Sequence, residues 1–398
     1  MPAQTVYREI RQLLNEHLDQ GVSESTRERL ALLVTGILSA RNAAPAQVAQ
    51  ALHTLGLSGA KAESIERRIR RIENDPQISA TLCFHPLARE RLRWGRPTEL
   101  LLILDPTCQE DRLVMVSAAI WYRGRALPLA WVIWPGNTPL REASFWARIR
   151  ALLAQVAALL PVGVPVTWLA DRAFGTPSFT DLLVEYGWHY IVRVQGHTRC
   201  RTRVGQEQSV QQAVHLRGQR AKLRGQVFKK RGWRTASVVV YWGRTYQTPL
   251  CLVSDLAPQW ALIHLYRRRY AIEATFRHYK AYGWRWEQGQ VMTLQHVERL
   301  LVGMALATWV ALMVGTQVAH ELLAHPPTGR RRTKPWAAKY SLFSLGLERI
   351  ACLQHADSHR ALRWQLTDWD APNWEDQITQ HHAYAFVFAP RQGRLYAY

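Results

Sequence analysis

The pattern of apolar positions divides the chain into a helical beginning and a strand-rich middle. Within residues 1–80, apolar residues recur every three or four positions, which predicts short amphipathic helices. Ser23 is a candidate N-cap for one helix, and Pro45 stands in the first turn of another. The pattern then changes to three apolar runs of strand length, at 99–105, 112–124 and 126–134.

Helical and strand patterns alternate in the next stretch. The expected elements are a helix at 141–159, a strand at 164–171, a helix at 176–186 and a strand at 188–195. Three strands followed by this alternation predict a mixed α/β sheet.

A basic segment interrupts the alternation. Residues 196–234 contain 11 Lys or Arg and a single acid, Glu207. Because two strand patterns follow it, at 237–243 and 248–255, we expect a basic, β-rich insertion over 196–257. Two helices are expected afterwards, at 259–281 and 294–323.

The run Leu300–Ala319 is long enough to cross a bilayer. It contains Thr308, Thr316 and Gln317, so a buried core helix is the favoured interpretation and a membrane span is the alternative.

The charge points to the kind of partner. The 398 residues include 51 Lys and Arg against 30 Asp and Glu, a formal net charge of +21. Such self-repulsion favours a polyanionic partner such as nucleic acid. Seventeen Trp residues are more than a core needs, and some could stack on bases, although many must be core residues.

The cysteines argue against a zinc ribbon and against redox chemistry. All five are scattered singly, with no CxxC pair, which is typical of reduced thiols in a cytoplasm. The N-terminal residues are amphipathic and charged, so no signal peptide is expected.

Two aspartates occupy positions where burial would make a charged carboxylate unfavourable. Asp105 ends the apolar run 99–105, and Asp171 ends the run 164–171. A carboxylate at the end of a buried strand requires hydrogen bonds or a cation. Each alone is as easily explained as a turn or helix-cap residue, but together at one sheet edge they would form a Mg²⁺ site.

A third acid lies on the predicted helix 259–281. At 100° per residue, Tyr266, Arg269, Glu273 and Lys280 share a stripe about 60° wide beside the apolar face. This arrangement would let the cations hold phosphates while Glu273 holds metal. The alternative is an exposed stripe of ion pairs.

The fourth N-terminal helix is rich in arginine. Arg67, Arg68 and Arg71 on this helix are candidates for contact with DNA, because short helices that end in an Arg-rich helix suit a helical DNA-binding domain. A solvated charged face is the alternative, because residues 1–80 carry 10 basic and 9 acidic residues.

These motifs resemble a known family. The spacing Tyr266-x2-Arg269-x3-Glu273-x6-Lys280 matches the Y-R-E-K signature of the IS4-type bacterial insertion-sequence transposases. Three further sequence blocks are similar to conserved blocks of this family: LDPT at Asp105, ADRAF at Asp171 and SLFSLGLERI at 341–350. The resemblance covers roughly residues 95–350. Ala173 departs from the glycine common at its position.

The resemblance implies a fold and an activity. The fold would be α/β, with an RNase H-like catalytic core interrupted by a β-rich insertion and preceded by an all-helical DNA-binding domain. Asp105, Asp171 and Glu273 would be a DDE triad that holds two Mg²⁺ or Mn²⁺ ions for cleavage and transfer of DNA strands. The implied divisions are a helical domain at 1–80, the core at 95–195 and 258–325, the insertion at 196–257, and a basic and aromatic C-terminal region at 326–398.

The resemblance also implies DNA contacts. Tyr266, Arg269 and Lys280 would contact DNA near the element end. Either Trp233 or Trp242 would stack on a flipped base, although both could be core residues. From their charge, Lys229, Lys230 and Arg231 are expected to lie along the phosphate backbone.

The expected partner is double-stranded DNA, bound by a homodimer in the cytoplasm at the nucleoid, without a membrane. The alternatives are a nuclease of the same fold and a catalytically inactive DNA-binding protein.

Overall fold

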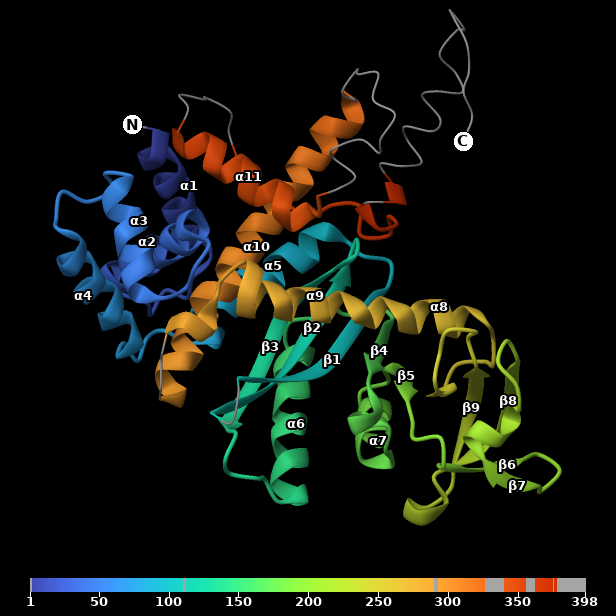
Figure 1. Ribbon diagram of the computed structural model, residues 1–398. Coiled ribbons are helices and arrows are strands. Elements are labelled where there is room, and N and C mark those ends of the chain that lie inside the picture. Colours follow the sequence, from blue (N-terminus) through green and yellow to red (C-terminus); the bar gives the residue numbers. More distant parts are fainter. Residues whose placement is uncertain are drawn as a thin grey trace, which may run out of the picture.

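The structure is a computed structural model that describes residues 2–109, 112–289, 293–325, 340–355, 362–374 and 376–377. The N-terminal region is helical, as the periodicity predicts (Figure 1). Its helices are α1 (Pro2–His17), α2 (Glu24–Ala40), α3 (Pro45–Thr54) and α4 (Ala62–Glu73). Ser23 caps α2 by accepting a hydrogen bond from the Thr26 backbone N–H, and Pro45 begins α3.

A link that the sequence pattern did not reveal joins these helices to the sheet. It consists of a π-helical turn, η1 (Ala80–Phe84), and α5 (His85–Gly95). Phe84 is fully buried and stacks at a tilt on Trp131, with ring centroids 5.9 Å apart. The link therefore contributes to the core instead of acting as a loose connection.

Within the described residues, ten strands form one sheet in the order β3-β2-β1-β4-β5-β10-β9-β8-β6-β7. The strands of the first part are β1 (Leu100–Gln109), β2 (Leu113–Tyr122), β3 (Arg125–Pro135), β4 (Val166–Ala170) and β5 (His189–Arg193). Those of the second part are β6 (Arg199–Thr202), β7 (Glu207–Ser209), β8 (Arg220–Val227), β9 (Arg234–Tyr241) and β10 (Leu250–Ser254). The fold is thus mixed α/β, with β1, β4 and β5 parallel and the outer strands antiparallel.

The strands of the predicted insertion extend this sheet. β10 pairs antiparallel with β5, and β9 pairs with β10, so the basic segment is hydrogen-bonded to the core strands through a continuous ladder. Sequence periodicity predicted β9 and β10 but not β6, β7 and β8, and it gave no indication that these strands would join the same sheet.

Helices pack on the part of the sheet that runs from β3 to β5. α6 (Glu142–Ala157) packs on β3, and α7 (Pro177–Glu185) packs on β5. The expected helix at 259–281 is a run of helical turns: α8 (Ala261–Arg267), the 3₁₀ turn η5 (Arg268–Tyr270), α9 (Ala271–Arg277) and the π-helical turn η6 (His278–Tyr282). α9 contacts β1, β2 and β3. A further 3₁₀ turn, η7 (Trp286–Gly289), follows.

The long apolar helix α10 (Leu294–Ala324) contacts β3, α2 and α11 (Leu342–His355). It is the one helix among the described residues that is long and apolar enough to cross a membrane, and 89% of its most apolar window is buried within the fold. This burial agrees with the expected core helix. The predicted C-terminal region 326–398 lies largely outside the described residues.

α10 and α11 meet at two glycines. A Cβ atom at Gly315 would lie 1.9 Å from the backbone oxygen of Leu342, and one at Gly346 would lie 1.8 Å from that of Ala311. Real Cβ atoms do not approach oxygen this closely, so only glycine permits this helix–helix distance.

Gly315→Ala and Gly346→Ala should therefore each lower the midpoint of thermal unfolding. The added methyl meets rigid backbone, so overpacking of about 1–3 kcal/mol should exceed the roughly 1 kcal/mol that alanine gains over glycine in a helix. Gly59→Ala is the control, because nothing lies within 4 Å of its added Cβ. Equal midpoints for all three variants would contradict the close packing.

Candidate active site

The first two acids come from neighbouring parallel strands. β1 and β4 pair in a register that sets Leu104 opposite Ala170, so Asp105 and Asp171 lie side by side where β4 ends. β1 continues to Gln109, so Asp105 is inside the strand, opposite Ser117 of β2, and not at the strand end that the sequence predicts. The residues before them are buried because these strands lie at the centre of the sheet. Asp105 is 8% exposed, and Asp171 is half-buried.

The third acid, Glu273, comes from α9. This short helix buries Ile272 and Phe276 against the sheet and leaves Glu273 half-buried at the same edge. The structure thus brings Asp105, Asp171 and Glu273 into one neighbourhood, although they are far apart in sequence.

Arg269 lies between two of these acids. Its guanidinium donates to Asp105 Oδ1 at 2.9 Å and to Glu273 Oε1 at 2.8 Å. Arg269 is 6% exposed and Tyr266 is 2% exposed, so these members of the predicted stripe face the protein interior. The alternative, an exposed stripe of ion pairs, therefore does not fit Tyr266 and Arg269, whereas Glu273 and Lys280 are half-buried and take part in ion pairs.

The acids influence one another electrostatically. Burial raises the pKa of Asp105 to about 6; Arg269 opposes this shift, and Asp171 and Glu273 add to it. Burial also disfavours the charged form of Arg269, but Asp105, Tyr266, Asp171 and Glu273 together more than offset it and raise the pKa of Arg269.

A cavity of about 360 Å³ opens over the acids. Its lining includes all three carboxylates together with Arg269, Arg277, Lys280, Thr107, Pro106 and Phe276. Lys280 donates to the backbone oxygen of Cys108 and lies 3.7 Å from Glu287. A negative floor with a cationic wall suits a phosphate group approached by divalent cations.

The three carboxylates are suitable ligands for a hard divalent cation, but in this structure their oxygens are not arranged around a common metal position. Asp171 Oδ1 is buried without a hydrogen-bond partner, since Arg193 is 3.9 Å away, and carboxylate oxygens are the ligands that Mg²⁺ prefers. Among the described residues, no three acidic, histidine or cysteine side chains are arranged to hold a metal ion. The guanidinium of Arg269 occupies the space between Asp105 and Glu273.

The two predicted base-stacking residues lie elsewhere. Trp233 is half-buried with the Arg201 guanidinium 4.6 Å from its ring centre, and the Trp242 indole donates to the Tyr246 backbone oxygen at 3.0 Å. Neither is among the residues that line the carboxylate cavity.

The predicted backbone-binding trio forms a short 3₁₀ turn, η4 (Lys229–Arg231). Lys229 pairs with Glu207 at 2.6 Å, and Arg231 pairs with Glu142 at 2.6 Å. Within the described part of the chain, Lys230 is the exposed member without an acidic partner. Two of the three charges are therefore partly neutralised.

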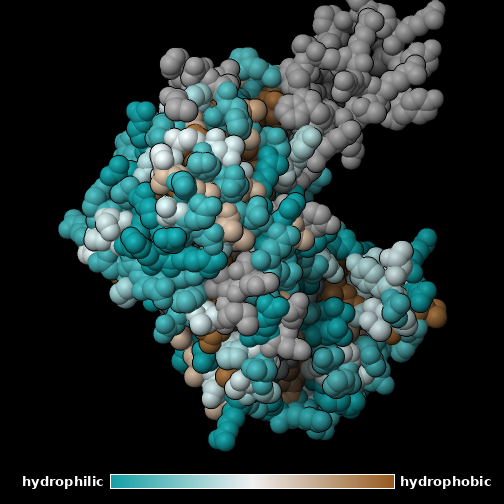
Figure 2. All heavy atoms as spheres, turned by 60° about the vertical axis from the view of Figure 1, so that its left-hand side comes forward, coloured by the Kyte–Doolittle hydropathy of each residue, from teal (hydrophilic) through white to brown (hydrophobic). Residues whose placement is uncertain are grey.

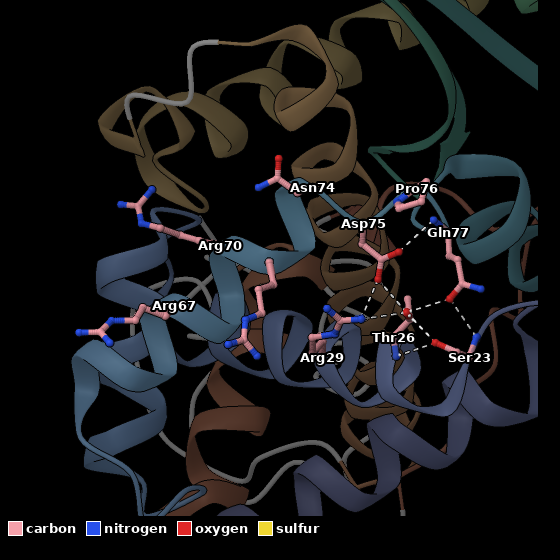
Figure 3. A pocket seen from close by; sticks show the side chains of 10 residues that line it. Ser23, Thr26, Arg29, Arg67, Arg70, Asn74, Asp75, Pro76 and Gln77 are labelled. Atoms are coloured by element: carbon pink, nitrogen blue, oxygen red, sulfur yellow. Dashed lines mark hydrogen bonds and ion pairs between the residues drawn. The ribbon is translucent and has the colours of Figure 1, made fainter.

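Three of the four arginines of α4, namely Arg67, Arg70 and Arg71, border a second, open cavity of about 490 Å³. Figure 3 shows Arg67 and Arg70 extending away from a hydrogen-bonded network of Ser23, Thr26, Arg29, Asp75 and Gln77.

The arginines of α4 that are predicted to contact DNA differ in whether an acidic side chain pairs with them. Arg67 and Arg71 are exposed and line this cavity, and neither has an acidic partner in the described ranges. Arg68 pairs with Glu28 at 3.2 Å, and Arg70 pairs with Glu66 at 2.7 Å. Mostly hydrophilic residues cover this helical face (Figure 2).

Sequence reasoning missed several cations. Arg193 approaches Asp171, and Arg277 lines the carboxylate cavity. On β8, Arg220 and Lys222 lie over the ring of Trp260, at 4.6 and 5.3 Å from its centre. The alternation of β8 would have placed Arg220 and Lys222 on one face, but Trp260 is distant in sequence.

A family model matches part of the chain. The family model described as "Transposase DDE domain" matches residues 146–310, a span that includes Asp171 and Glu273 but not Asp105. A search of curated proteins finds no match.

Two solved structures show a low similarity to the chain. One is a piggyBac transposase synaptic complex with hairpin DNA, at 8% identity and a TM-score of 0.45 over 98% of this chain and 80% of that one. The other is Argonaute from Aquifex aeolicus, at 8% identity and a TM-score of 0.23 over 44% of this chain and 25% of that one. Both similarities are too low to establish a shared fold.

The raised pKa of Asp105 predicts a dependence of stability on pH. Between about pH 4 and 6 the folded protein keeps Asp105 protonated while the unfolded chain ionises it. The stability that this proton provides is therefore present below about pH 4 and is lost as pH rises through about 6, on the order of 2–3 kcal/mol by pH 7.

Relative to the wild type, Asp105→Asn should thus gain thermal stability on going from pH 5 to pH 7. Asp181→Asn, which removes a half-buried partner of Arg234 outside the carboxylate cavity, serves as the control. A constant difference between wild type and Asp105→Asn across this range would refute the raised pKa.

Proposed function

We propose that this protein is a DDE-type DNA transposase that cleaves DNA at the ends of its element and joins the released strands to target DNA. The observation that carries this proposal is the convergence of Asp105 and Asp171, from adjacent parallel strands, with Glu273 from α9 beneath a cavity that has a cationic wall. The family match over 146–310 supports it.

The residues suggest a division of labour. Asp105, Asp171 and Glu273 would hold two Mg²⁺ or Mn²⁺ ions, which when bound supply Lewis-acid stabilisation of the attacking and leaving oxygens. Arg277 and Lys280 on the cavity wall would orient the phosphate that carries the scissile bond. Phe276, buried beside them, would limit the water that reaches the site.

We also propose a subfamily, an oligomeric state and a location for this protein. The Tyr266, Arg269, Glu273 and Lys280 spacing supports an IS4-type bacterial transposase with an RNase H-like core. We propose that it acts as a homodimer on double-stranded DNA in the cytoplasm, with α10 as a core helix. The burial of α10 and the free state of all five cysteines support this location.

We propose Arg67 and Arg71 as the DNA contacts of the helical region. Arg68 and the trio Lys229, Lys230 and Arg231 would contribute less, because acids already pair with most of them. Trp233 and Trp242 remain candidates for base stacking. Because neither lines the carboxylate cavity, we expect them to contact DNA bases away from the scissile bond.

Cleavage should require each acid. With Mg²⁺ or Mn²⁺ and DNA that flanks the protein's own coding sequence, Asp105→Asn, Asp171→Asn and Glu273→Gln should each lower single-turnover cleavage at least about a hundredfold, because a neutral amide binds the cation far more weakly than a carboxylate.

Asp181→Asn is the matched control and should cleave like the wild type. Cleavage of random DNA at the same rate as flanking DNA, without strand joining, would indicate a nuclease. Binding without any cleavage would indicate a DNA-binding protein only.

The salt dependence of binding should identify the phosphate contacts. Counterion release predicts that Arg67→Gln with Arg71→Gln flattens the log–log slope of duplex affinity against salt by about 2, because each free arginine neutralises one phosphate. Arg70→Gln on the same helix is the control and should have less effect, since Arg70 already pairs with Glu66.

Replacement of Lys229, Lys230 and Arg231 together should flatten the slope by only about 1. Fluorescence anisotropy of a labelled duplex between 50 and 200 mM salt would measure both changes. An unchanged slope in the Arg67 and Arg71 variant would mean that α4 faces solvent in the complex.

A further inference from the structure

Arg269 is the counter-ion of the carboxylate site. Its two terminal nitrogens contact Asp105 and Glu273 at 2.9 and 2.8 Å, and the side chain is almost fully buried. A single positive charge thus serves two acids directly, with Asp171 close enough to interact electrostatically. The oxygens that Arg269 binds are the ones that a divalent cation would need.

The contact satisfies Arg269 only in part. Its Nε atom is buried without a hydrogen-bond partner, and an unpaired buried polar atom carries a desolvation cost. Asp171 Oδ1 is likewise buried and unbonded on the other side of the site. The acids are therefore only partly neutralised, which leaves a driving force for additional positive charge.

The backbone at Arg269 departs from a regular α-helix. Arg269 lies in η5, the 3₁₀ turn that separates α8 from α9. A 3₁₀ stretch inside a helical run often marks a position of conformational adjustment. The carboxylate cavity beside it is open, and Arg277 and Lys280 on the same wall would attract a phosphate there.

We propose that Arg269 is a place-holder for the divalent cations: it neutralises the acids in the DNA-free protein and turns to a DNA phosphate when the cations enter. The inference rests on the proposed function. A guanidinium and a divalent cation compete for the same carboxylate oxygens because their positive charges repel at such short range, whereas a phosphate offers Arg269 an equivalent bidentate partner. DNA and metal binding would then favour each other, because such coupling is reciprocal.

The first test is Mn²⁺ binding to the full-length protein without DNA, measured by calorimetry or by the electron paramagnetic resonance signal of free Mn²⁺. Arg269→Gln should bind Mn²⁺ at least about tenfold more tightly than the wild type, because the competing cation is gone. Arg277→Gln removes the same charge from the same cavity without freeing a carboxylate, and should change the affinity much less.

The outcomes separate this inference from the proposed function. If Mn²⁺ binding is lost in Asp105→Asn but is equal or weaker in Arg269→Gln than in the wild type, the place-holder role is refuted and the metal site stands. If no variant binds Mn²⁺, or if binding survives Asp105→Asn, the proposed metal site itself fails.

Arg269→Lys guards against misfolding, because it keeps the charge but cannot bridge two carboxylates. It should bind Mn²⁺ with an affinity between those of the wild type and Arg269→Gln.

Ca²⁺ should tighten the binding of a labelled duplex by a larger factor in the wild type than in Arg269→Gln. Equal factors would overturn the coupling.

Discussion

The parallel pairing of β1 with β4 is the constraint on which the candidate site depends. A register shift of one residue would send Asp105 or Asp171 to the opposite face of the sheet, because side chains alternate along a strand. Buried strands on both sides hold this register, and α9 then needs only to pack on β1, β2 and β3 to deliver Glu273. Arg269 completes the arrangement by offsetting charges that would otherwise oppose folding.

Much of this could be predicted from the sequence because it depends on local pattern. Continuous apolar runs identified β1 and β4, and an aspartate at the end of each run indicated a sheet edge. Helical periodicity placed Arg269 and Glu273 on one stripe, and the i, i+4 ion pair between them follows from that spacing. These features need no knowledge of distant contacts.

The rest depends on contacts between distant segments, which periodicity does not contain. No local signal indicates that Arg269 would point into the fold toward Asp105, 164 positions away. The pairing of Arg231 with Glu142 likewise arises because η4 meets the start of α6 in space. The segmentation of the helical run at η5 is also hidden, since residues 268–270 are ordinary in helical propensity.

The continuity of the sheet has a further consequence for geometry. Four strand spacings separate β4 from β8, through β5, β10 and β9, which amounts to about 19 Å at the usual distance between neighbouring strands. That length is roughly half a turn of B-form DNA. Because hydrogen bonds join these strands continuously, the sheet fixes the distance between the carboxylates and the cations around Trp260. Any duplex that touches both must present its backbone at a fixed helical phase.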